Sequence, residues 1–73
     1  MIMVVKTSNK GPLNLRASTS TSSKLLAAIP YGTKLEVTAV NANWYKTTYN
    51  NNEGYVMAQY LANVENTYDR SKL

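Results

Sequence analysis

The stretch NANWYKTTYNNNEGYVMAQYL, residues 41–61, contains the one tryptophan of the chain and four of its six tyrosines. Two runs rich in aromatic and β-branched residues, 44–49 and 54–58, flank the polar segment 50–53. Such runs on either side of an Asn-rich turn are typical of a β-hairpin. Asn and Gly both tolerate positive φ, so residues 50–54 are suited to reverse the chain whichever turn type they adopt.

Side-chain alternation assigns the two faces of this hairpin. The inward positions are Tyr45, Thr47 and Val56, and the outward positions are Trp44, Lys46, Thr48, Tyr55 and Met57. The charge of Lys46 marks its face as the solvated one, so Trp44 is expected to be an exposed aromatic. An exposed aromatic cluster indicates a recognition surface. The alternative is that Trp44 and Tyr55 lie over a loop and only cover a small core.

Length and composition exclude several classes of protein. At 73 residues the chain forms one domain at most, and a chain of this size buries only about 60% of the surface that its unfolded form exposes. It has no cysteine and no histidine, so we expect neither disulfides nor a metal site, and no cofactor. The common nucleophile and base pairs are absent, and the acidic residues are dispersed at Glu36, Glu53, Glu65 and Asp69. We therefore expect a protein that is not an enzyme.

Charge and targeting signals narrow the choice of partner. The net charge of +4 and the pI near 9.5 favour anionic partners. The basic residues are scattered singly rather than in a stripe with interleaved aromatics, so we predict no nucleic-acid binding. The opening MIMVV is too short for a signal-peptide core or a membrane span, so we predict no membrane partner and expect any export signal outside this chain, which resembles an excised module.

The segments before residue 41 are predicted to be short strands joined by turns. Residues 3–6 are expected to form an edge strand, and residues 13–16 a strand that alternates Leu with polar residues. The Ser/Thr-rich segment 17–23 predicts an exposed loop, either a mobile lip of a binding site or a plain solvated loop. Residues 24–29 and 34–39 are predicted to pair as a hairpin around a tight turn at Pro30 and Gly32.

The segments that follow the hairpin of residues 44–58 complete a domain predicted to span residues 1–64. Residues 59–61 are expected to form a 3-10 turn, residues 62–64 a closing strand, and residues 65–73 a polar tail or the start of a linker. No segment has a sustained helical period, and strands this short bury enough apolar surface only in a sheet that curls into a small barrel. The predicted core consists of Leu13, Leu15, Leu25, Ala27, Ile29, Leu35, Val37, Tyr45, Val56 and Leu61.

Four pieces of the sequence carry a family resemblance: LNLRAS followed by the Ser/Thr loop, then KLLAAIPYGTKLEV, NWYKTTY and GYVMAQYL. In this order and spacing they resemble a bacterial SH3 (SH3b) domain over residues 4–64. The resemblance implies an all-β, SH3-like barrel of about five to seven short, mostly antiparallel strands with one 3-10 turn, which agrees with the alternation pattern.

The resemblance also implies a function. SH3b modules are typically appended to bacterial and phage cell-wall hydrolases and surface proteins, where they anchor the attached domain on peptidoglycan. We therefore expect a module that binds a peptidoglycan peptide or glycan and is covalently attached to a catalytic or surface domain. Its expected location is extracellular or in the cell wall, as a monomeric module or as one copy of a tandem array.

The same resemblance implies candidate site residues. In eukaryotic SH3 domains, the ligand groove is lined by the first aromatic of a WW-like pair and by the proline and tyrosine of a GYIPxxY-like run. The matching positions here are Trp44, Met57 and Tyr60. Met57 replaces the proline, and residues 13–18 replace the tyrosine-rich motif that opens the eukaryotic groove, which argues against proline-rich ligands.

Further candidates for ligand binding are Tyr55, Tyr49 and Arg16. Aromatic faces pack well on Gly- and Ala-rich peptides and on sugar C–H surfaces. Arg16 and Lys46 are suited to meet wall carboxylates or teichoic phosphates, although an outward Arg beside a loop often only braces that loop. Two other functions remain open: a module that binds a peptide or a neighbouring domain of its parent, and a spacer in a tandem array. An attached hydrolase would favour wall binding, and a cytosolic signalling domain would favour the interaction module.

Overall fold

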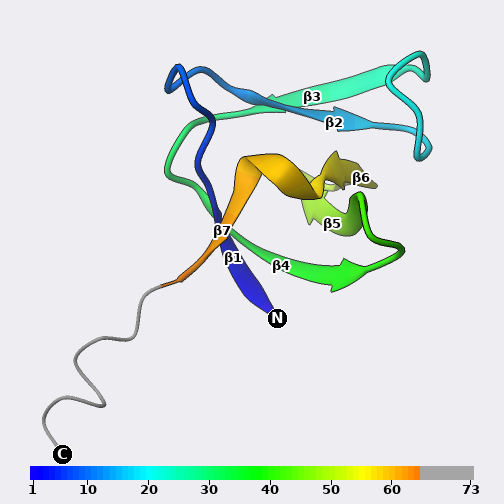
Figure 1. The fold of residues 1–73 in the computed structure, drawn as a ribbon. Helices are drawn as coiled ribbons and strands as arrows, with labels where there is room; N and C mark the ends of the chain where they lie inside the picture. The colour runs from blue at the N-terminus through cyan, green and yellow to red at the C-terminus, as the bar shows by residue number, and fades with distance from the viewer. Residues whose placement is uncertain (65–73) are drawn as a thin grey trace, which may run out of the picture.

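The computed structural model describes residues 1–64, which form seven strands and one 3-10 turn (Figure 1). In chain order these are β1 Ile2–Val5, β2 Leu13–Arg16, β3 Leu25–Ile29, β4 Lys34–Ala39, β5 Trp44–Tyr49, β6 Asn52–Met57, the 3-10 turn η1 Ala58–Tyr60, and β7 Leu61–Asn63. The strands pair antiparallel in the order β3-β2-β6-β5-β4-β1-β7. The predicted all-β class and the 3-10 turn are confirmed. The predicted tail, residues 65–73, lies outside the described residues.

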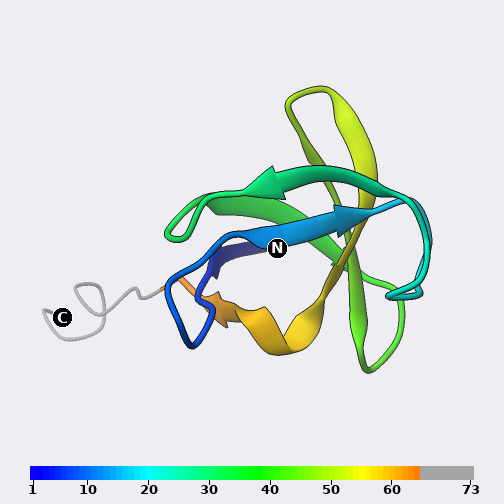
Figure 2. The same cartoon turned by 90° about the horizontal axis from the view of Figure 1, so that it is seen from above.

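The sheet curls until its two ends share one core. In Figure 1, β2 and β3 run across the top and β4 lies at the bottom, and Figure 2 shows the β5–β6 hairpin crossing β2 and β3 steeply. Met3 and Val5 of β1 belong to the same buried cluster as Leu15 of β2 and Ile29 of β3, although β1 and β3 lie near opposite ends of the strand order. A flat sheet does not bring these side chains together, so the sheet forms a small barrel.

Most of the predicted core is buried. The buried members are Leu13, Leu15, Ile29, Leu35, Val37 and Val56, and Ala27, Tyr45 and Leu61 are partly buried against them. The prediction for Leu25 is wrong, since its side chain is 50% exposed. Leu15 pairs with Ala27 but Arg16 pairs with Leu25, so one extra residue, Leu26, interrupts the alternation of β3. Because side chains alternate along a strand, this bulge turns Leu25 outward and lets Leu26 pack on the core.

Two predictions about strand pairing are also wrong. β1 is not an edge strand, because it pairs with β4 on one side and with β7 on the other, and it supplies two core residues that the sequence analysis missed, Met3 and Val5. β3 does not pair with β4, because β3 pairs with β2 and β4 pairs with β1 and β5. The predicted turn between them is present, with Gly32 at φ 87°, but it carries the chain from one side of the barrel to the other. Hydrogen bonds from Gly32 N to Val5 O and from Val5 N to Thr33 O, both 2.9 Å, hold this turn against β1.

The predicted hairpin within residues 41–61 is confirmed as β5 and β6, with a shorter turn than the sequence predicts. Asn50 and Asn51 have φ of 52° and 66°, and Tyr49 pairs directly with Asn52. Two successive residues with positive φ form the primed turn that suits the twist of a hairpin. Gly54, which the sequence placed at the turn, therefore lies inside β6.

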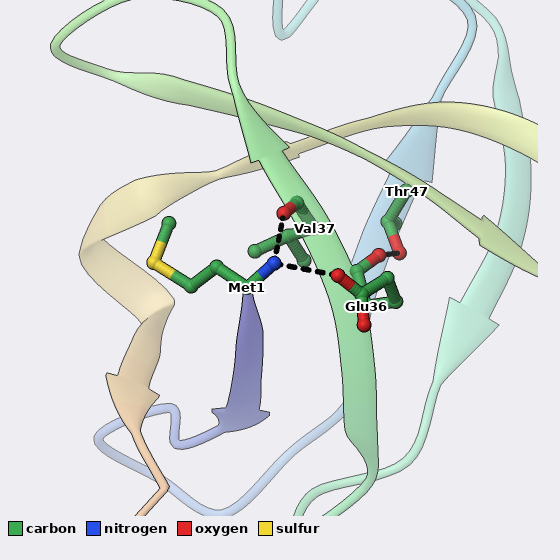
Figure 3. Close-up of polar contacts among 4 residues, drawn as sticks. All are labelled: Met1, Glu36, Val37 and Thr47. Atoms are coloured by element: carbon green, nitrogen blue, oxygen red, sulfur yellow. Dashed lines mark hydrogen bonds and ion pairs between the residues drawn. The ribbon is translucent and has the colours of Figure 1, made fainter.

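Polar groups at the junction of β1, β4 and β5 are hydrogen-bonded (Figure 3). The α-amino nitrogen of Met1 donates to the Glu36 carboxylate at 2.5 Å and to Val37 O at 3.2 Å. Thr47 is buried, and its hydroxyl donates to Glu36 O at 2.8 Å. Throughout residues 1–64, every buried side-chain nitrogen or oxygen has a hydrogen-bond partner. No helix in this part of the chain is both long and apolar enough to span a membrane.

Candidate ligand-binding groove

An open groove of about 340 Å³ lies between the β1–β2 loop, β2, the loop 17–23 and the segment from β6 into η1. Its volume lies within the range of roughly 300 to 1,000 Å³ that is usual for ligand pockets. Four of the six predicted site residues line it: Arg16, Trp44, Met57 and Tyr60. The tertiary structure therefore brings together side chains from three separate stretches of the chain: residues 7–21, Trp44 of β5, and residues 57–60.

The β5–β6 hairpin and η1 position the apolar part of the groove. Trp44 and Met57 are direct cross-strand partners, so their side chains lie side by side on the outer face of the hairpin. The start of η1 is tied to the β4–β5 turn by a hydrogen bond from Ala58 N to Asn43 O at 2.8 Å. Its end is tied to the residue that follows β1 by one from Lys6 N to Tyr60 O, also 2.8 Å. These bonds hold Tyr60 beside the Trp44–Met57 pair.

Trp44 lies on the predicted face, but the prediction that it is exposed is wrong. Only 8% of its surface is accessible, and it does not belong to the central apolar cluster. Residues of the β1–β2 loop, Met57 and Tyr60 line the groove together with it. Alternation assigns a side chain to a face of a strand, but it does not tell what covers that face. Trp44 is therefore the floor of the groove and not a protruding ring.

Trp44 lines the groove although most of its ring is covered. The one polar group of its side chain is the indole N–H, which is a donor only. A ligand in the groove that accepts a hydrogen bond from it would satisfy this polar end, as is usual for a buried tryptophan.

Arg16 is half-buried at the side of the groove formed by β2. Its Nη1 donates to the carbonyl oxygen of Ser23 at 2.9 Å, so Arg16 does brace the loop 17–23. This bond engages one donor of a guanidinium that has several. Within the described part of the chain no carboxylate forms an ion pair with Arg16. The guanidinium has further N–H donors that can bind a ligand.

The loop 17–23 borders the groove through Thr21. Its own hydroxyls hold it together: Ser23 Oγ donates to Ser18 O at 3.2 Å and to Ser20 O at 2.6 Å. A backbone bond from Ala17 N to Lys24 O at 2.9 Å closes its base. The loop is thus a hydrogen-bonded rim of the site.

The opposite wall of the groove is one that the sequence analysis missed. It consists of Thr7, Ser8, Asn9 and Pro12 in the β1–β2 loop, next to Asn14 of β2. The buried Thr7 hydroxyl donates to Gly11 O at 2.7 Å, and Gly11 N donates to Asn9 Oδ1 at 2.9 Å, which fixes the shape of the loop. The polar run ending in Gly-Pro is a sufficient signal for a turn, but nothing local places that turn beside Trp44.

The remaining candidates lie elsewhere. Tyr55 is half-buried on the outer face, between its partners Arg16 and Lys46, and does not line the groove. Tyr49 packs against the core cluster from the inner face. Lys46 pairs with Glu53 at 3.0 Å in a separate shallow depression over β4, β5 and β6. The Glu53 carboxylate raises the pKa of Lys46 by accepting its hydrogen bond and by its negative charge.

A family model of the bacterial SH3 domain matches residues 11–62. The chain belongs to the bacterial SH3 domain family. The match includes every groove residue except Thr7, Ser8 and Asn9. A search among curated proteins found no match to this chain. Domains of this family are typically non-catalytic binding modules. Residues 1–64 of this SH3 domain contain no group of three or more His, Cys, Asp or Glu side chains placed to hold a metal ion.

Proposed function

We propose that this bacterial SH3 domain is a non-catalytic module that binds peptidoglycan through the Trp44, Met57 and Tyr60 groove. The observation that carries the proposal is the covered tryptophan that lines an open, polar-walled groove together with Met57 and Tyr60. Aromatic faces pack on small apolar side chains and sugar C–H groups at low entropic cost, because they have few rotatable bonds. The hydroxyls and amides on the walls are suited to bond the amides of a wall peptide or the hydroxyls of a glycan.

The shape of the groove supports a polymer as the ligand. The groove is open to solvent and is not an enclosed cavity, so it can receive a segment of a longer chain. Under this proposal the domain targets a covalently attached hydrolase or surface domain to the bacterial envelope, outside the cell. One small groove supports modest affinity, and tandem copies on one chain would raise it through effective concentration.

The test is co-sedimentation of the purified domain with peptidoglycan sacculi stripped of teichoic acid. The informative variant is Trp44→Phe, which keeps an aromatic ring at a covered position but removes the N–H; Trp44→Ala would leave a cavity and destabilise the fold. We expect Trp44→Phe to bind sacculi about tenfold more weakly, because a ligand acceptor then loses its partner.

The control is Thr48→Ala, an exposed position on the same face of β5 that does not line the groove. It should sediment like the parent. If Trp44→Phe also sediments like the parent, the groove is not the site. If the parent itself stays in the supernatant, peptidoglycan binding is refuted and a peptide or neighbouring domain becomes the leading partner.

A further inference from the structure

We propose that the groove selects a free carboxylate of a wall peptide and that Arg16 is the residue that recognises it. The inference rests on the proposed wall-binding function and specifies which chemical group of the wall is read. It follows from the charge of the groove, the anchoring of the Arg16 side chain and the hydrogen-bonding groups around it.

Among the described residues, the groove carries positive charge without a compensating carboxylate. Arg16 is the one charged side chain among the residues of the range 1–64 that line it. The acidic residues of the described range 1–64 are Glu36 and Glu53, and both line the separate depression over β4, β5 and β6. Lys46 lies in that depression too and is neutralised by Glu53 at 3.0 Å. An anionic group is therefore attracted to the groove, and an amine is repelled from it.

Arg16 is held in place before a ligand arrives. Its side chain is half-buried, and the bond from Nη1 to Ser23 O at 2.9 Å fixes one arm of the guanidinium on the loop 17–23. Anchoring of this kind reduces the side-chain entropy that ligand binding would otherwise cost. The planar fork of the remaining N–H groups matches the two oxygens of a carboxylate.

The groups beside Arg16 in the groove also favour a ligand that ends in a carboxylate. Trp44 lines the groove, and the one polar group of its side chain, the indole N–H, is a donor only. Asn14 presents an exposed amide on the same strand as Arg16. A peptide that ends in a carboxylate offers acceptors in sequence, first the carboxylate oxygens and then the preceding carbonyl. Stem peptides of peptidoglycan carry such free carboxylates, so the groove can distinguish a free carboxylate from an amidated one.

A phosphate polymer fits these observations less well. Polyanions are usually held by several cations in a row, each of which neutralises a phosphate. Within residues 1–64, this groove offers one cation between amides, hydroxyls and aromatic rings. The arrangement suits a single charged group at the end or side of a peptide.

The experiment uses the signal of the one tryptophan as a reporter. The ¹⁵N-labelled domain is titrated with stem peptides released from sacculi by an amidase, and with the same peptides after chemical amidation of their carboxylates. We expect the free peptides to shift the Trp44 indole N–H resonance and to bind at least about tenfold more tightly than the amidated peptides. Arg16→Gln should remove this difference, and Arg16→Lys, which keeps the charge without the fork, should retain part of it.

Lys46→Gln is the matched control, because it removes a cation that lies outside the groove, and it should keep the full preference. Equal affinities of the parent for free and amidated peptides would overturn the carboxylate inference while sedimentation with sacculi still supports wall binding. Stronger binding of purified teichoic acid than of the free peptides would also overturn it. Failure to sediment together with an unmoved Trp44 signal would overturn both proposals. If Arg16→Gln does not fold, the free and amidated titrations of the parent still decide the preference.

Discussion

Gly54 determines how closely two strands approach beside the groove. A Cβ at this position would lie 2.5 Å from the carbonyl oxygen of Arg16, 3.0 Å from Leu26 Cδ1 and 3.1 Å from Leu15 Cγ. The backbone oxygen cannot give way without a shift of β2, so only glycine permits the observed crossing of β6 and β2. Because Arg16 lines the groove, the size of residue 54 also controls where the guanidinium sits.

We predict that Gly54→Ala lowers the free energy of unfolding by about 1–3 kcal/mol, as expected for overpacking against a backbone atom. The measurement is the denaturant midpoint of the variant and the parent. If the sacculus-binding proposal is correct, Gly54→Ala should also bind sacculi more weakly than the parent, because Arg16 is displaced. Thr48→Ala should bind like the parent. A midpoint equal to that of the parent would show that β2 can shift without loss of stability.

At the scale of elements, the β5–β6 hairpin sets the register of the site. Its turn places Tyr49 opposite Asn52, and the same register places Trp44 opposite Met57 five residues farther along each strand. A slip by one residue would move Met57 to the inner face and separate the pair. The conformation of Asn50 and Asn51 is therefore a requirement for the groove, even though both residues lie at the other end of the hairpin.

We predict that Asn51→Val lowers the free energy of unfolding by about 1–3 kcal/mol, because a β-branched residue is strained at a φ of 66°. Asn51→Gly is the matched substitution and should stay within about 0.5 kcal/mol of the parent, since glycine adopts this conformation freely. Denaturant unfolding of the two variants gives the comparison. Equal stabilities would mean that the turn relaxes to another type without loss.

At the scale of the molecule, one small core holds the whole barrel. Side chains from β1, β2, β3, β4 and β6 meet in a single cluster, and every strand pairs with a neighbour across a curled sheet. Domains of this size have a free energy of unfolding of only about 5 kcal/mol or slightly more. Truncation of one large core side chain is therefore expected to remove a large part of this free energy of unfolding.

We predict that Leu15→Ala lowers the free energy of unfolding by about 2–4 kcal/mol, because Leu15 has no exposed surface. Leu25→Ala makes the same chemical change at a side chain that is 50% exposed, and should cost less than about 0.5 kcal/mol. Thermal or denaturant unfolding of both variants separates the two positions. Similar losses would contradict the bulge that turns Leu25 outward.

Local sequence patterns were enough to establish the all-β class, most of the strands, the β5–β6 hairpin and the 3-10 turn. Alternation in a segment such as residues 13–16 and the Asn-rich turn depend on neighbours along the chain, so they are readable without the fold. The family resemblance added Trp44, Met57 and Tyr60, and all three line the groove. Arg16, chosen because it points outward beside a loop, lines it as well.

Contacts between distant segments decided the rest. They make β1 an interior strand, pair β3 with β2, cover Trp44, and place the β1–β2 loop opposite the loop 17–23 across the groove. They also separate Tyr49 and Tyr55 from the groove. The physical reason is that strand pairing in a barrel depends on the curvature of the whole sheet and on the burial of a common core. Neither can be predicted from the residue pattern of any one strand.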